Sequence, residues 1–111
     1  MGTRNLTMVL VDGDIKVAQY CQWDGQPDRR GIGISKFIQQ DMDLERFRAA
    51  ARECKFVDFD YGSRDNPEFH RDTGADILAL VQNHRVRKIY NSVAFAGDSL
   101  FCEWAYLLDF D

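Results

Sequence analysis

A loop rich in turn-forming residues brings together side chains that could hold a nucleotide. Between Trp23 and Gly31 the chain reads WDGQPDRRG, which places an aromatic ring, the carboxylate of Asp24 and the cations of Arg29 and Arg30 close together. The ring could stack on a base, the carboxylate could accept hydrogen bonds from ribose hydroxyls, and the guanidinium groups could pair with phosphates. The loop is therefore a candidate ligand-binding segment.

A purely structural interpretation of the same loop also exists. Asp24-Gly25 would then form a turn, and Arg29 and Arg30 would be solvated. For Trp23 taken alone we favour a core position, because Trp is heavily buried on average. For the loop as a whole, both interpretations stay open at this point.

Four further residues complete the predicted ligand-binding set. Gln22 precedes the loop, and Arg4 stands at the head of the first predicted strand. Arg4 could reach a bound anion, although an ion pair with Asp24 is favoured. Asp98 and Ser99 could form another polar rim of a pocket, although a turn or helix cap is favoured for them.

Catalysis and metal binding have little support in the sequence. Cys21, Cys54 and Cys102 are widely spaced, and neither His70 nor His84 forms a recognisable signature with any of them. We therefore predict free, inert thiols, no catalytic residue, no metal and no cofactor. A small hydrolase is the trailing alternative, because no pair of nucleophile and base can be named.

Length and charge limit the remaining classes. The 111 residues fit a single domain covering 1–111, and 45% hydrophobic and 13% aromatic residues suffice for a packed core. A net charge of −4 argues against broad nucleic-acid binding, although an acidic surface could meet a basic partner. No segment has the length of a membrane span or the pattern of a signal peptide, so we expect a cytoplasmic location without membrane contact.

The spacing of apolar and turn residues predicts an α+β fold. Residues 5–11 and 15–22 are typical of two strands, joined by a hairpin turn at Asp12-Gly13. One face of the second strand should carry Val17, Gln19 and Cys21, and both faces of this strand are expected to be covered.

Three helices and a last strand are predicted after the hairpin. One helix should contain Ile34, Phe37 and Ile38, and a second should begin at Asp43 and bury Leu44, Phe47 and Ala51. A third should be capped by Asp72 or Thr73 and bury Ile77, Leu78, Leu80 and Val81. Residues 56–69 are expected to be irregular, and 86–96 are ambiguous between strand and turn. Residues 101–110 should form a strand, which gives a small antiparallel sheet packed with about three helices.

Several short motifs carry a resemblance to a known group of proteins. They are Gly2-Thr3-Arg4, the run Gln19–Gly25 (QYCQWDG), Arg71–Gly74 (RDTG) and Asp98–Tyr106 (DSLFCEWAY). The chain resembles small, mostly uncharacterised phage and prophage proteins with a GTR start and a QYGQWDGYP-like loop. Here Cys21 replaces the usual Gly and Gln26 the usual Tyr. The resemblance implies a phage accessory protein that blunts a host defence.

Two functional hypotheses follow. The leading one is a non-enzymatic protein that sequesters a small nucleotide-derived immune signal, with a homo-oligomer interface as a place to enclose it. The alternative is a protein-binding inhibitor of a defence complex such as a CRISPR effector, which would place its acidic surface against a basic channel.

Overall fold

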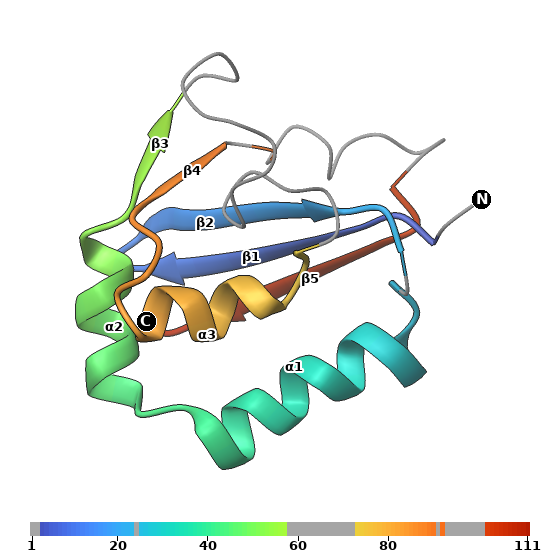
Figure 1. The fold of residues 1–111 in the computed structure, drawn as a ribbon, viewed down its shortest axis with the longest axis horizontal. Coiled ribbons are helices and arrows are strands. Elements are labelled where there is room, and N and C mark those ends of the chain that lie inside the picture. The colour runs from blue at the N-terminus through green and yellow to red at the C-terminus, as the bar shows by residue number, and fades with distance from the viewer. Residues whose placement is uncertain (1–2, 24, 58–72, 91, 93–101) are drawn as a thin grey trace.

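A three-stranded sheet forms the centre of the protein (Figure 1). The computed structural model describes residues 3–23, 25–57, 73–90, 92 and 102–111. Its main sheet has the order β2-β1-β5, with β1 at Asn5–Val11, β2 at Asp14–Cys21 and β5 at Trp104–Asp109. Together with the helices described below, this small sheet gives an α+β fold.

The predicted hairpin is confirmed. β1 and β2 pair antiparallel, from Asn5 opposite Cys21 to Val11 opposite Asp14. Asp12 and Gly13 between them have φ of 56° and 78°. Positive φ at both central residues matches the right-handed twist of a two-residue hairpin, and Asp and Gly tolerate it well. Both faces of β2 are covered along most of its length, as expected.

The last strand runs in a direction that the sequence did not predict. β5 pairs parallel with β1, with Asn5 opposite Trp104 and Leu10 opposite Asp109. The three-stranded sheet is therefore mixed, and only its hairpin is antiparallel. An apolar and aromatic run indicates a strand but not its direction, because direction depends on where the preceding chain returns to the sheet.

The first helical stretch begins earlier than expected, at Pro27. It consists of two π-helical segments, η1 (Pro27–Gly31) and η2 (Phe37–Asp41), on either side of α1 (Ile32–Lys36). The predicted loop therefore ends at Gln26. Proline suits the first helical position because its φ is already that of a helix and because an N–H at this position would have no partner within the helix.

The other two helices lie close to their predicted positions. α2 (Leu44–Arg52) begins after Asp43, whose side chain accepts a hydrogen bond from the Arg46 N–H, so this cap is confirmed. α3 (Asp76–Gln82) begins after Ala75 and has no side-chain cap, so the Thr73 cap is wrong. The alternative, Asp72, lies outside the described residues.

All three helical stretches cover the same face of the main sheet (Figure 1). A single core joins them to the strands, and Phe47 packs edge-on against Phe37 and beside Phe110. Ile38 and Leu44 are exposed instead of buried, and Leu80 is only half-buried. The buried apolar residues of this core are Val9, Val11, Val17, Ile34, Phe37, Phe47, Ala50, Ala51, Cys54, Ile77, Leu78, Val81, Val86, Ile89 and Leu108.

A second, two-stranded sheet lies beside β2. Its strands β3 (Lys55–Val57) and β4 (Lys88–Tyr90) are parallel, so the region expected to be irregular begins with a strand and the ambiguous region contains one. After β4, the Ser92 N–H donates to the Ala18 carbonyl oxygen of β2, which ties this part of the chain to the main sheet. In the part of the chain that the structure describes, no helix could cross a membrane.

Candidate ligand-binding site

The face of the sheet that packs on the helices changes from apolar to polar along its length. Val9 lies between Val17 and Leu108 in the core, whereas Thr7, one step along the same face, lies opposite Gln19 and Tyr106. The last pair on this face is Asn5 and Cys21. Asn5, Thr7, Gln19 and Cys21 are all at most 5% exposed. We call these four residues with Tyr106 and Arg30 the polar cluster.

The Asn5 side chain holds the start of the predicted binding loop through hydrogen bonds to its backbone. Its Nδ2 lies 3.1 Å from the Thr3 carbonyl oxygen, 3.3 Å from that of Cys21 and 3.0 Å from that of Trp23, so the amide donates into the chain on both sides. The Gly25 N–H donates to the Thr3 carbonyl oxygen at 3.1 Å. Gly25 packs so closely on Asn5 that an added Cβ would lie 2.6 Å from the Asn5 Cβ. A side chain at position 25 would therefore displace the loop.

Tyr106 fixes the same loop from the neighbouring strand. Its hydroxyl donates to the Gly25 carbonyl oxygen at 2.6 Å. Burial raises the pKa of the Tyr106 hydroxyl; nearby Arg30 opposes this shift and Asp28 reinforces it. Tyr106 therefore remains a neutral hydrogen-bond donor at physiological pH, as the contact with Gly25 requires.

Arg30 extends from η1 over the edge of the polar cluster. Its Nη2 lies 3.3 Å from both the Cys21 Sγ and the Trp23 carbonyl oxygen. Gly74, with φ of 50°, backs the guanidinium so closely that an added Cβ would lie 2.7 Å from the Arg30 Cζ. Among the described residues, no carboxylate forms an ion pair with Arg30. The described groups that hold this cation are therefore neutral.

Three buried polar atoms of the polar cluster lack hydrogen-bond partners among the described residues. They are the Asn5 Oδ1, the Thr7 Oγ1 and the Arg30 Nε. Leaving a buried polar group unpaired costs roughly 1–3 kcal/mol, and buried sites of this kind are commonly completed by an ordered water or a ligand. The polar cluster can accept a hydrogen bond through Asn5 and donate one through Arg30.

The structure brings together part of the predicted set of ligand-binding residues. Arg30 belongs to the polar cluster, Gln22 is half-buried directly after Cys21, and Arg29 is exposed on η1. Trp23 is 43% exposed, so the core position favoured for it is wrong. Asp24, Asp98 and Ser99 lie outside the described residues.

The backbone of Arg4 is hydrogen-bonded to residues at the start of β5. Its backbone N–H donates to the Glu103 carboxylate at 3.0 Å, and its carbonyl oxygen accepts from the N–H groups of Glu103 and Trp104. Trp104 is 42% exposed. Asn5 pairs with Cys21 on one side and with Trp104 on the other. Trp23, two residues after Cys21, and Trp104 are therefore at the same end of the sheet.

Sequence reasoning missed Asn5, Thr7 and Tyr106. A signal was present, because Asn5 and Thr7 are two residues apart on a strand whose other positions, from Leu6 to Val11, are apolar. Two polar side chains at this spacing share a face, and the hairpin register places them opposite Gln19 and Cys21. A polar patch on a face expected to be buried is more informative than an exposed polar loop.

An open hollow lies along α3. Its volume is about 600 Å³, and Thr73, which precedes the Gly74 that backs Arg30, is among its lining residues. Its lining includes one acidic and one basic residue, Asp76 and Arg85, and the apolar Ala79 and Leu80. Within the described ranges, no group of three or more His, Cys, Asp or Glu residues could hold a metal ion.

Comparisons with known proteins identify no family for this chain. No protein-family model, no curated protein and no solved structure matches the chain.

Proposed function

We propose that this protein is a non-enzymatic phage accessory protein that binds and sequesters a small, anionic, nucleotide-derived signal of a host defence system. The observation that carries the proposal is the Arg30 guanidinium, which is held by the Cys21 Sγ and the Trp23 carbonyl oxygen with no carboxylate partner among the described residues. A guanidinium held by neutral groups retains its full charge for an incoming anion, and its planar donors suit phosphate oxygens.

Trp23 supports a ligand that carries a base as well as a phosphate. The indole is 43% exposed, and its own carbonyl oxygen contacts Arg30, so a stacking surface and a cation belong to the same short segment. Stacking on an aromatic side chain contributes about 1–3 kcal/mol per base. The phage setting rests on the resemblance of the GTR start and the Gln19–Gly25 run, and it would place the protein in the host cytoplasm.

Sequestration suits this site better than catalysis. No described side chain near Arg30 forms a pair of nucleophile and base, and the thiol of Cys21 is 1% exposed. The hydrogen bonds from Asn5 and Tyr106 hold the carbonyl groups of Trp23 and Gly25 before a ligand arrives, and such preorganisation lowers the entropic cost of binding.

Native mass spectrometry tests the proposal. The protein is incubated separately with cyclic dinucleotides, cyclic oligonucleotides and ADP-ribose derivatives, and the retained mass is read before and after denaturation. We expect one class to be retained and released chemically intact. Arg30→Gln should abolish retention, and Trp23→Ala should weaken it, whereas Lys36→Gln on α1 removes one positive charge away from the site and should leave it unchanged. Retention of no compound by the wild-type protein would exclude the proposal.

A protein-binding inhibitor is the second candidate, and one observation favours it. Trp104 and Leu107 on β5 are 42% and 53% exposed, which is high for large apolar side chains on a strand. Trp is enriched at the centres of protein interfaces, and an exposed Leu beside it adds apolar area. Co-purification with a defence complex that persists without any small ligand, and that is lost on substitution of surface Asp and Glu residues, would favour this candidate.

A further inference from the structure

β5 is an edge strand of the main sheet as described. β5 hydrogen-bonds to β1 on one side, and within the described ranges no strand pairs with its other side. The Trp104 N–H donates to Arg4 and the Phe110 N–H to Leu10, so even-numbered residues direct their backbone groups toward β1. By alternation, the N–H and C=O groups of Ala105, Leu107 and Asp109 point outward.

The same three residues have exposed side chains. Ala105, Leu107 and Asp109 are all exposed, and Leu107 reaches 53%, the highest value among the exposed large apolar residues. Edge strands in proteins that remain monomeric usually carry Lys, Pro or a bulge. β5 reads WAYLLD and has none of these, apart from the acidic residue at its end.

We propose that β5 is the interface with a second copy of this chain, paired antiparallel with the β5 of its partner about Leu107. A two-fold axis perpendicular to the sheet keeps the helices of both copies on one face. Because side chains alternate between the faces, an even-numbered residue must then lie opposite an even-numbered one, and an odd-numbered residue opposite an odd-numbered one. With Leu107 opposite its own copy, outward-pointing backbone groups meet outward-pointing groups. The two sheets become one continuous sheet, in which both β5 strands are paired on both sides.

The side chains favour this register. On the helix-covered face, Trp104 lies opposite Phe110 of the partner copy, and Tyr106 lies opposite Leu108, so aromatic residues meet apolar ones. On the other face, Leu107 meets itself and Ala105 meets Asp109. The two neighbouring allowed registers lose the Leu107 pair. The register about Tyr106 places Leu107 opposite Ala105, and the register about Leu108 places Leu107 opposite Asp109. The register about Leu107 therefore gives this strand its best apolar pairing.

Three short hydrogen bonds within each copy reduce the acidic repulsion between the copies. Only Glu103 and Asp111 would face each other in the register about Leu107. The Glu103 carboxylate accepts from the Arg4 N–H at 3.0 Å, and the Asp111 carboxylate accepts from the N–H groups of Asp12 and Gly13 at 2.5 and 2.7 Å. Both carboxylates are therefore already directed toward groups of their own chain.

Light scattering coupled to size exclusion, in the presence of a reductant, tests the proposal. We expect a mass about twice the 12.8 kDa of one chain. Leu107→Lys and Leu107→Glu should each be monomeric, because each would place identical charges opposite one another. An equimolar mixture of the two variants should again form a dimer. Leu44→Lys, at a residue that is 47% exposed on α2, is the control and should remain dimeric.

Three results would overturn the interface. They are a monomeric wild-type protein, a Leu107→Lys variant that stays dimeric, and two Leu107 variants that fail to associate when mixed. Leu107 is exposed and its N–H points away from β1, so the substitutions leave the fold intact; circular dichroism of each variant verifies this.

Discussion

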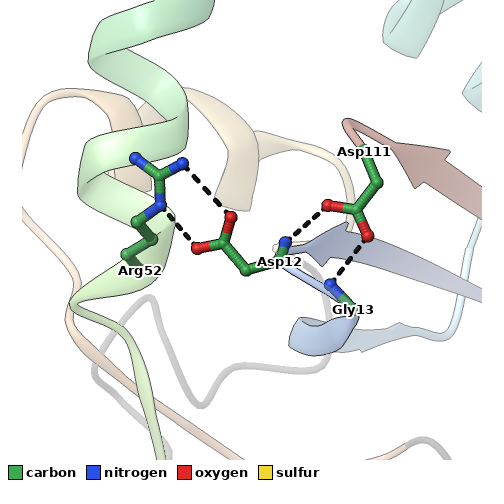
Figure 2. Close-up of polar contacts among 4 residues, drawn as sticks. All are labelled: Asp12, Gly13, Arg52 and Asp111. Carbon is green, nitrogen blue, oxygen red and sulfur yellow. Dashed lines mark hydrogen bonds and ion pairs between the residues drawn. The ribbon is translucent and has the colours of Figure 1, made fainter.

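Asp12 and Arg52 form an ion pair with two contacts between the hairpin turn and α2. The Arg52 Nε lies 2.6 Å from the Asp12 Oδ2, and its Nη2 lies 3.2 Å from the Oδ1 (Figure 2). The backbone N–H groups of Asp12 and Gly13 bind the Asp111 carboxylate at the same time. One turn therefore connects β1, β2, α2 and the residues that follow β5.

Loss of the Asp12 charge should lower stability only where the carboxylate is ionised. The hydrogen bond from Arg52 holds the pKa of Asp12 below its usual 3.8. A folded-state pKa below the unfolded value stabilises the protein above the unfolded pKa, and this contribution disappears as pH falls through the folded pKa. Asp12→Asn should thus lower the melting temperature slightly at pH 7 and have no effect near pH 2, because both side chains are exposed and solvent screens the pair.

Asparagine is the informative substitution at this position because it tolerates the φ of 56° and keeps the size of the side chain, while it removes the charge and one of the two oxygens that accept from Arg52. Asp14→Asn on the same hairpin is the matched control. A melting-temperature difference that persists unchanged to pH 2 would show that Asp12 acts through the turn conformation and not through Arg52.

Two glycine substitutions should have opposite effects on stability. Gly25→Ala would bring a Cβ within 2.6 Å of the Asn5 Cβ and 2.7 Å of the Thr3 carbonyl oxygen, so we expect a loss on the order of 2 kcal/mol in the free energy of unfolding. Gly33→Ala on α1 meets nothing within 4 Å and should add about 0.5–1 kcal/mol. Urea unfolding of both variants measures this; a neutral Gly25→Ala would mean that the loop is not held against Asn5.

The sequence predicts local elements well where a local rule decides them. The Asp12-Gly13 turn, the Asp43 cap and the apolar spacing of Phe47 and Ala51 each depend on neighbours within a few residues. The direction of β5 depends on a contact between residues about 100 positions apart, and no local pattern encodes it. The sequence also did not predict that Ile38 and Leu44 are exposed. An apolar stripe on a helix does not show which of its residues will contact the sheet.

The candidate site was predictable only in part for the same reason. Arg30 and Trp23 drew attention because they share a loop with turn residues. Their relation to Asn5, Tyr106 and Gly74 appears only when β1, β5 and the start of α3 are brought together. The alternation of polar side chains along β1 was readable, but its meaning required knowledge of the face that the helices cover.

The three cysteines should react in an order set by their surroundings. Burial raises the pKa of the Cys54 thiol to about 11, an effect that Glu53 reinforces and that Lys16 and Arg87 oppose. Because the thiolate is the reactive form, Cys54 should resist iodoacetamide at pH 8 in the folded protein. Cys102 is half-buried and should be labelled first, whereas Cys21 is 1% exposed. Peptide mass spectrometry after timed labelling checks this order, and urea should make all three thiols reactive; early labelling of Cys54 would contradict its buried position.

Gly74 and Arg30 should be energetically coupled, because each occupies space that the other defines. In the wild-type background, Gly74→Ala combines backbone strain at a φ of 50° with a Cβ that lies 2.7 Å from the Arg30 Cζ. In an Arg30→Ala background only the strain remains, at roughly 1–2 kcal/mol. The difference between the two costs, measured by urea unfolding of all four proteins, should be roughly 0.5–3 kcal/mol, as expected for residues in contact. Additive costs would show that the guanidinium moves away from Gly74 freely, and a mobile Arg30 would be a poor anchor for an anion.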